Sequence, residues 1–150
     1  MSFLKTPFKI GNLELKSNVL YSPLAGCSDY PYRKIVRECS PDLGLFFCEM
    51  VKMDALVRLD RGTFNLLDYD TSQAPIGAQL IGSCPKLAAK GAKILEDMGF
   101  CLIDLNCGCP VDKVTGDGCG SGLLKEPERI GEILSAMIAS VDIPITVKIR

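Results

Sequence analysis

Residues 75–105, PIGAQLIGSCPKLAAKGAKILEDMGFCLIDL, contain the pattern that decides the fold. A short apolar run, Pro75–Ile81, precedes a segment, Pro85–Met98, whose apolar residues recur at helical spacing. Proline is favoured as a first helical residue, and Gly99 is suited to end the helix. A second apolar run, Phe100–Leu105, follows directly. Runs that are apolar throughout are typical of parallel strands covered by helices, so this stretch predicts a strand–helix–strand unit.

The same alternation extends in both directions along the chain. The other expected elements are a β-hairpin (Phe8–Ile10 and Leu13–Leu15 around the turn Gly11-Asn12), a strand (Asn18–Ser22), a helix capped by Ser28 or Asp29 that continues through Val36, a strand (Leu45–Met50), a helix (Lys52–Arg61), a glycine-rich loop (Asn106 to about Leu124), a helix (Pro127 to about Ser140) and a strand (Ile143–Ile149). After the hairpin, the pattern is strand–helix repeated four times plus one strand.

Two α/β architectures fit this alternation: an open doubly wound sheet and a (β/α)8 TIM barrel. The first strand is not followed by G-x-G-x-x-G, which weakens the dinucleotide-binding form of the open sheet. A barrel needs about 250 residues. We therefore expect residues 1–150 to be the N-terminal part of a TIM-barrel domain, supplying strands one to five and helices one to four. An apolar last strand without a partner fits that expectation, because it would leave a bare sheet edge.

Composition narrows the class of protein further. Apolar residues make up 47% of the chain, and the formal net charge of −1 gives no general basic surface for nucleic acid. No apolar run is long enough to span a membrane, and the N-terminal MSFLKTPFKIGNLEL lacks the apolar core of a signal peptide. Several of the eight cysteines lie inside apolar runs, as buried thiols do in reducing compartments. We expect a cytoplasmic protein that does not enter a membrane.

Ligands of both architectures bind at the carboxyl ends of the strands. The residues expected at those ends are Pro23-Leu24-Ala25-Gly26, Glu49-Met50, Gln79, Asn106–Pro110, Lys148 and Arg150. Polar and reactive groups thus collect at one rim of the predicted sheet. Strands in any protein end in loops, so position alone does not separate a ligand site from ordinary turns.

The loop after the fourth strand is more informative. Cys107, Cys109 and Cys119 offer three sulfurs, but their spacing is not C-x2-C and the chain has no histidine to complete a site. We therefore expect no metal. Cys109 differs from the cysteines in apolar runs, because it lies beyond the strand in a loop rich in glycine and proline. Glycines allow the backbone to approach a flat ligand closely.

Taken together, the motifs resemble the tRNA-dihydrouridine synthases. Six segments show the resemblance, in order and with matching gaps: PLAGCSDYPYR (Pro23–Arg33), CEM (Cys48–Met50), GAQLIGSCP (Gly77–Pro85), IDLNCGCPVDKV (Ile103–Val114), GSGLLKEP (Gly120–Pro127) and PITVKIR (Pro144–Arg150). The element N-x-G-C-P-x-x-K-V is specific. The PLAG and TVKIR elements have relatives in other FMN barrels, such as dihydroorotate dehydrogenases.

The resemblance implies an FMN enzyme that reduces uridine in tRNA to 5,6-dihydrouridine and is itself re-reduced by NADPH. Pro23, Leu24 and Ala25 would line the flavin through their backbone. Gln79 would hydrogen-bond the pyrimidine edge of the isoalloxazine ring, since an amide both donates and accepts. Lys148 would lie near flavin N1 and O2, where an ammonium favours the anionic reduced form. Without the motifs, Gln79 and Lys148 would be interpreted as strand-end residues paired with their neighbours.

Cys109 matches the family's catalytic cysteine. Hydride adds to C6 of the uracil and C5 must take a proton, which a thiol can supply because an unperturbed thiol, with a pKa of about 8.5, is mostly protonated at neutral pH. Asn106 and Lys113 match positions expected to meet the uracil or the RNA backbone. Arg33 and Lys34 are further candidates for tRNA phosphates, although exposed basic residues on helices are usually only solvated.

Two alternatives stay open at this point. The parent could be another FMN barrel that acts on a free pyrimidine, as a dihydroorotate dehydrogenase does, or the chain could be an inactive barrel fragment that pairs with another half-barrel. The family's later flavin-phosphate loops and its C-terminal helical RNA-binding domain have no counterpart in these 150 residues. The sequence leaves the choice of uridine, NADPH against NADH, and the oligomeric state undecided, with a monomer as the working expectation.

Overall fold

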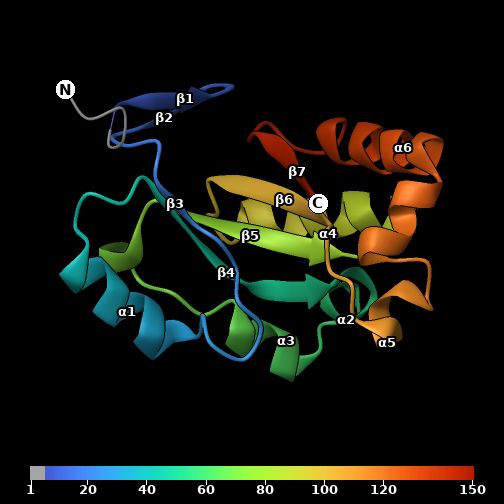
Figure 1. Ribbon diagram of the computed structural model, residues 1–150, viewed down its shortest axis with the longest axis horizontal. Coiled ribbons are helices and arrows are strands. Elements are labelled where there is room, and N and C mark those ends of the chain that lie inside the picture. The colour runs from blue at the N-terminus through green and yellow to red at the C-terminus, as the bar shows by residue number, and fades with distance from the viewer. Residues whose placement is uncertain (1–5) are drawn as a thin grey trace.

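The computed structural model of the chain describes residues 6–150 (Figure 1). The first five residues of the segment considered above as a signal peptide therefore lie outside the described part. The strands are β1 (Phe8–Ile10), β2 (Leu13–Leu15), β3 (Leu20–Tyr21), β4 (Leu45–Lys52), β5 (Ile76–Ile81), β6 (Leu102–Cys107) and β7 (Ile145–Ile149). The α-helices are α1 (Tyr30–Cys39), α2 (Met53–Val57), α3 (Arg61–Leu66), α4 (Pro85–Asp97), α5 (Asp112–Thr115) and α6 (Pro127–Ile138), and the short 3-10 helices are η1 (Thr71–Gln73) and η2 (Gly120–Lys125).

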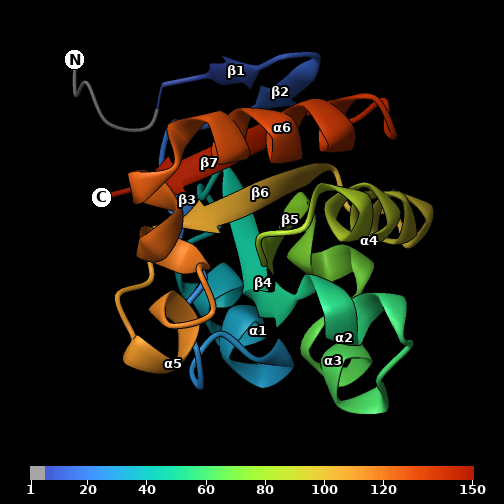
Figure 2. The same ribbon diagram turned by 90° about the vertical axis from the view of Figure 1, so that its right-hand side faces the viewer.

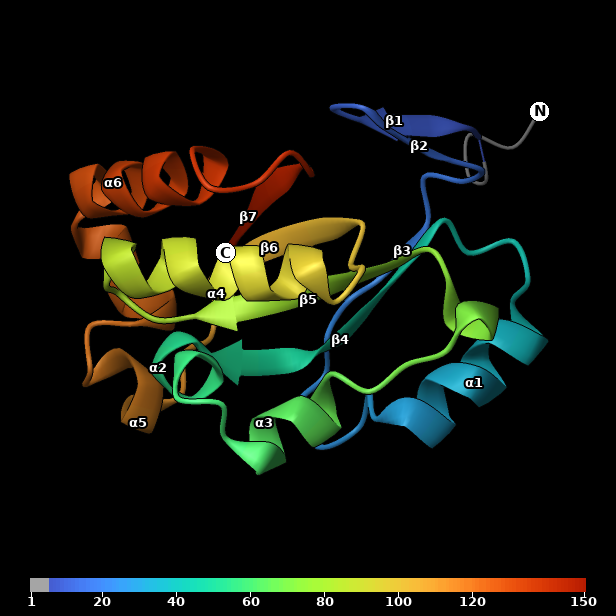
Figure 3. The same ribbon diagram turned by 180° about the vertical axis from the view of Figure 1, so that it is seen from behind.

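Strands β3 to β7 form one parallel sheet in the order β3-β4-β5-β6-β7. A doubly wound sheet reverses its strand order at a switch point, so this order excludes that alternative. Helix α4 lies behind β5 and β6 in Figure 1 and in front of them in Figure 3, and α6 lies next to β7. Residues of both helices pack into the same hydrophobic core as the outer face of the sheet. Figure 2 shows the strands curling around the opposite face, as in part of a barrel.

Successive side chains of a strand point to opposite faces of the sheet, so each strand has residues on an outer and on an inner face. Ala78 and Leu80 of β5, with Ile103 and Leu105 of β6, belong to the main hydrophobic core that also includes residues of α4 and α6. The intervening residues point to the inner face, and several of them are polar. The main core therefore fixes the sheet from outside and leaves the inner face for the site.

The predicted N-terminal hairpin is confirmed. β1 and β2 pair antiparallel, with Ile10 opposite Leu13 across the Gly11-Asn12 turn. Gly11 has a φ of +57°, a conformation that glycine adopts without strain. Leu15 packs with Leu45 and Leu102, the first residues of β4 and β6. The hairpin thereby covers apolar side chains at the amino ends of the strands.

Helix boundaries agree with the sequence where a capping residue defines them. α1 begins after Asp29, whose carboxylate accepts a hydrogen bond from the Tyr32 N–H at 3.0 Å. α4 begins at Pro85, and Gly99 follows its end with a φ of +92°. α6 begins at Pro127 but ends at Ile138, before the predicted Ser140.

The single helix predicted for Lys52–Arg61 is wrong. The structure has two helices, α2 and α3, separated by Leu59, which adopts a φ of +59°. The Asp60 carboxylate accepts from the Thr63 N–H at 2.8 Å and from the Thr63 hydroxyl at 3.0 Å. This N-cap starts a new helix in place of continuing the old one.

Strand boundaries also differ from the predictions. The first barrel strand is only Leu20–Tyr21, since the Val19 N–H is bonded to Ser17 Oγ at 3.1 Å and so does not join the sheet. β4 continues to Lys52, and β7 begins at Ile145. β6 extends through Asn106 to Cys107, residues that were placed in the loop. That loop also contains α5 and η2.

Candidate functional site

A cavity of about 330 Å³ lies at the carboxyl ends of the strands. Its lining brings together residues from distant parts of the sequence: Ser22, Pro23, Leu24, Ala25, Met50, Gln79, Asn106, Gly108, Cys109 and Lys148. All the residues predicted to bind the cofactor line this cavity, together with the predicted catalytic Cys109 and the predicted substrate residue Asn106. In a barrel, this end of the strands is where ligands bind.

Gln79 and Asp104 form the buried floor beneath the cavity. They are opposite each other across β5 and β6, and their side chains are 2% and 5% exposed. Gln79 Nε2 donates to Asp104 Oδ2 at 2.7 Å, and Thr146 of β7 donates from its hydroxyl to Asp104 Oδ1 at 2.7 Å. Both carboxylate oxygens of Asp104 thus have partners within the sheet.

Asn106 connects this floor to the loop that contains Cys109. Its Nδ2 donates to Gln79 Oε1 at 2.8 Å. Its Oδ1 accepts from the backbone N–H of Gly108 at 3.1 Å and from that of Cys109 at 2.9 Å. Because the asparagine side chain reaches its own backbone two and three residues later, it folds the chain sharply after β6.

Cys109 is held by its backbone on both sides and lies partly exposed at the cavity. Its carbonyl accepts from the Ser121 N–H at 2.9 Å. Gly120, with a φ of +56°, packs so closely that a Cβ there would lie 2.6 Å from the Cys109 carbonyl oxygen. The thiol therefore projects from a loop whose backbone has a defined position.

The segment after β3 forms another wall of the cavity. Ser28 Oγ accepts from the Leu24 N–H at 2.8 Å and donates to the Leu24 carbonyl at 2.9 Å. The buried carboxylate of Glu49, within β4, accepts from the Gly26 N–H at 2.7 Å. These bonds hold the backbone while the side chains of Leu24 and Ala25 stay exposed.

Charge in the site is concentrated on Lys148 and Asp104. Lys148 is exposed on β7 and is in register with Asn106. Burial raises the pKa of the Asp104 carboxyl, and the hydrogen bonds from Thr146 and Gln79 and the charge of Lys148 act in the opposite direction. The inner face therefore combines an exposed lysine with a desolvated carboxyl.

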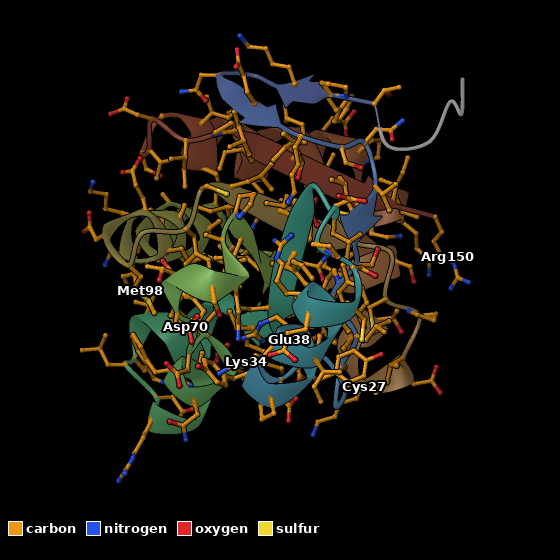
Figure 4. The ribbon with its side chains drawn as sticks, turned by 90° about the vertical axis from the view of Figure 1, so that its left-hand side faces the viewer. Cys27, Lys34, Glu38, Asp70, Met98 and Arg150 are labelled. Atoms are coloured by element: carbon orange, nitrogen blue, oxygen red, sulfur yellow. The ribbon has the colours of Figure 1, made fainter. Side chains whose placement is uncertain are left out.

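Three predicted residues lie elsewhere. Lys113 is exposed on α5 and is not among the residues that line the cavity. Arg33 is 0% exposed, so the idea that it contacts tRNA phosphates is wrong. Its guanidinium bonds Gln73 Oε1 at 3.0 Å and the backbone carbonyls of Ser28 and Asp68. Lys34 is exposed on α1 in the neighbourhood of Asp70 (Figure 4).

Sequence reasoning missed several residues that build the site. Asp104 and Thr146, which complete its hydrogen bonds, were not singled out at all. Glu49 and Met50 were expected at the rim but without a role: Met50 lines the cavity, and Glu49 holds the wall after β3. A signal for Asp104 was present, because it lies two residues before Asn106 in an apolar strand and so shares its face.

Two further observations concern metal ligands and helix length in the described part of the chain. Across residues 6–150, no cluster of three or more His, Cys, Asp or Glu side chains is suitable for holding a metal ion. Within the same range, none of the helices has the length and apolar character needed to cross a bilayer.

Solved structures with the same arrangement are TIM-barrel proteins, which confirms the predicted fold class. Histamine dehydrogenase from Rhizobium sp. 4-9 superposes with a TM-score of 0.67 at 16% identity, over 97% of this chain and 33% of that one. Morphinone reductase in complex with tetrahydroNAD superposes with a TM-score of 0.60 at 11% identity, over 99% and 64%. At these identities the likeness defines the fold alone.

Residues 20–150 match the family model described as Dihydrouridine synthase (Dus). The chain therefore belongs to the dihydrouridine synthase family, as its motifs predicted. "Probable tRNA-dihydrouridine synthase 1" of Synechocystis sp. is 38% identical over 96% of this chain and 40% of its own length. "tRNA-dihydrouridine synthase B" of Pseudomonas aeruginosa is 34% identical over 95% and 42%. The chain thus spans less than half the length of these relatives.

Proposed function

We propose that this chain is part of a tRNA-dihydrouridine synthase, which reduces uridine in tRNA to 5,6-dihydrouridine with bound FMN and with NADPH as the reductant. One observation supports the proposal most strongly. Apart from Lys113, the residues that the family motifs single out for the flavin, the proton and the uracil line one cavity at the carboxyl ends of the strands. The proposed reaction is that of the family, and the cavity is the proposed location of that reaction.

The chemistry of the cavity suits the isoalloxazine ring of FMN. A volume of about 330 Å³ lies within the range of about 300–1,000 Å³ that is usual for ligand sites. The backbone of Pro23–Ala25 offers a wall for a flat ring, Gln79 offers an amide to its polar edge, and Lys148 offers a positive charge. When bound there, reduced FMN supplies the hydride for C6 of the uracil.

In this proposal the chain's own residues deliver the proton and hold the substrate. The Cys109 thiol donates its proton to C5 of the uracil, so that one hydride and one proton saturate the C5–C6 bond. Asn106 fixes the loop that presents the thiol, and its amide lies at the edge of the cavity next to Gln79. Lys113, exposed on α5, binds the tRNA backbone outside the cavity. The partner is tRNA and the compartment is the cytoplasm.

The test uses the protein expressed at the full length of its gene, purified with FMN and incubated with NADPH and unmodified tRNA. Dihydrouridine is then measured by mass spectrometry for wild type, Cys109→Ala and Cys119→Ala. Cys119 lies in the same loop and is also partly exposed, but it does not line this cavity. Using a purified protein removes any second synthase from the measurement.

We expect wild type and Cys119→Ala to form dihydrouridine, and Cys109→Ala to bind FMN but to lose turnover by at least about 100-fold, as removal of a general acid does. Near-normal turnover of Cys109→Ala would refute the assignment of the proton donor. Reduction of free uracil or orotate, with tRNA unchanged by the wild type, would instead favour the free-pyrimidine alternative.

A further inference from the structure

A continuous chain of hydrogen bonds crosses the inner face of the sheet. It runs from the backbone N–H groups of Gly108 and Cys109 to Asn106, from Asn106 to Gln79, and from Gln79 to Asp104. Strand register explains the chain, because Asp104 of β6 is paired with Gln79 of β5 on one side and with Thr146 of β7 on the other. A change at Asp104 therefore reaches the loop of Cys109 through two amides.

The groups at the two ends of this series of hydrogen bonds determine which atom is the donor and which the acceptor in each bond. A backbone N–H can only donate, so Asn106 must turn its Oδ1 toward the Cys109 loop and its Nδ2 toward Gln79. Gln79 must then accept through Oε1 and donate through Nε2, and the Asp104 carboxylate is the acceptor that receives this bond. The orientation of both amides, which is often ambiguous, is thus determined by their partners.

The direction holds in either protonation state of Asp104. Burial raises the pKa of this carboxyl, and a proton on Oδ1 would be shared with the Thr146 hydroxyl, which can accept as well as donate. Oδ2 would still receive the bond from Gln79. The acceptor beneath Gln79 is therefore kept over a wide range of pH.

We infer that Asp104 is a positioning residue, which acts through Gln79 and Asn106 to fix what the cavity offers to its ligand. The Gln79 Nε2 group has two hydrogens, and its bond to Asp104 uses one of them. With Oε1 committed to Asn106, Gln79 presents a donor to the cavity. It selects a heteroaromatic ligand whose facing edge has an acceptor, such as a ring carbonyl or an unprotonated ring nitrogen.

Asp104 performs this role without touching the ligand. It is 5% exposed and is not among the residues that line the cavity, whereas Gln79 and Asn106 are. Without Asp104, only the bond from Asn106 would hold the Gln79 amide, and Nε2 would lose its partner on the floor side. The donor that Gln79 presents to the cavity would then no longer have a fixed direction.

This inference rests on the proposed function, so FMN is the probe. The dissociation constant of FMN is measured by flavin fluorescence titration, on the protein expressed at the full length of its gene. The variants are Asp104→Asn, Asp104→Leu, Gln79→Leu and the double variant Asp104→Leu/Gln79→Leu. Asparagine keeps an acceptor for Gln79 and can donate to Thr146, while leucine has a similar size and neither group.

We expect Asp104→Leu to weaken FMN binding about tenfold, and Asp104→Asn to stay within about threefold of wild type. In the Gln79→Leu background, Asp104→Leu should have no further effect, because the residue through which it acts is gone. A merely structural role would instead give the same loss in both backgrounds. Equal losses, or an Asp104→Asn variant as weak as Asp104→Leu, would overturn the inference.

Misfolding of a variant and failure of the proposed function are distinguished from the outcomes above. If Asp104→Leu does not fold, as judged by circular dichroism, the same cycle is run with Thr146→Val, which removes one of the two bonds that orient Asp104. Its loss of FMN affinity is expected to disappear in the Gln79→Leu background, and an unchanged loss there overturns the inference. Wild type that binds no FMN and forms no dihydrouridine would mean that the proposed function has failed.

Discussion

Two of the cysteines of this chain are exposed and two are fully buried, while the other four are partly exposed. Cys27 and Cys39 are exposed, whereas Cys48 and Cys107 are buried in β4 and β6. Burial raises the pKa of the Cys48 thiol to about 12 and that of the Cys107 thiol to about 11. The thiolate is the reactive form, so both burial and these pKa values suppress alkylation.

We therefore predict that iodoacetamide at about pH 8 labels Cys27 and Cys39 quickly and leaves Cys48 and Cys107 unmodified. Peptide mass spectrometry over a time course gives the rate for each residue. In denaturant all four should react at similar rates, which controls for digestion and detection. Labelling of Cys107 in the folded protein as fast as Cys39 would contradict the packing of β6.

The carboxyl of Asp70 supplies a prediction on pH. Hydrogen bonds from the Ser72 hydroxyl, then from the Tyr30 hydroxyl and the Ser72 N–H, lower its pKa from 3.8 to about 2. Because the folded pKa lies below the unfolded one, its stabilising contribution is complete above pH 3.8 and is lost as the pH falls through about 2. Asp70→Asn should therefore flatten the acid limb of the stability profile in that window. Urea unfolding at a series of pH values measures the slope, and an unchanged slope would contradict the hydrogen bonds.

The sequence showed the residues that face the cavity but not those that support them. Gln79, Asn106, Cys109 and Lys148 lie at strand ends, where position and motif both indicate a site. The role of Asp104 became visible only from strand register, which depends on pairing across β5, β6 and β7. The misassigned Arg33 has the same origin, since its partners lie up to 40 residues away along the sequence.

At the scale of elements, the loop between β6 and α6 depends on two glycines that differ in their surroundings. Gly118 and Gly120 both have a positive φ, +68° and +56°. A Cβ at Gly120 would lie 2.6 Å from the Cys109 carbonyl oxygen and 2.9 Å from Val114, whereas a Cβ at Gly118 would meet nothing within 4 Å. Alanine at either position incurs similar backbone strain. A comparison of the two alanine variants therefore reveals the effect of the contact with Cys109 alone.

We predict that Gly120→Ala lowers dihydrouridine formation by up to about 100-fold, because displacing a reacting group by about 1 Å can cost that much. Gly118→Ala should lose only stability and keep its rate within about threefold of wild type once both proteins are folded. Initial rates with saturating FMN and tRNA make the comparison. Equal rates for the two variants would show that the loop tolerates a shift at Cys109.

Elements were predictable where their own residues define them. The strand–helix–strand unit from β5 to β6 followed from hydrophobic periodicity, and α1 and α4 followed from Asp29 and Pro85 at their starts. The division between α2 and α3 did not, because apolar spacing continues across it while the Asp60 cap and the left-handed Leu59 interrupt the backbone. Strand lengths also depend on partners: the Val19 N–H bonds to Ser17 Oγ, and the pairing of β3 with β4 begins only at Leu20.

At the scale of the molecule, the order β3 to β7 makes a curved sheet whose inner face holds the polar network. The barrel could be predicted because every helix returns the chain to the adjacent position, so sequence order becomes strand order. Within residues 6–150, β3 and β7 are the two edges of this sheet. The edge at β7 is the longer one, and its Val147 and Ile149 are 37% and 57% exposed.

An exposed apolar edge strand is a template for pairing with another chain. We therefore predict that isolated residues 1–150 associate as their concentration rises from roughly 1 to 100 µM, which sedimentation velocity measures.

Replacing both Val147 and Ile149 with lysine, a residue that natural edge strands use against such pairing, should keep the isolated chain monomeric. Substituting lysine for Ile138, which lies at the end of α6 and is 61% exposed, is the control and should leave association unchanged. Wild type that stays monomeric throughout, or association that survives the double replacement, would mean that the β7 edge is not the contact.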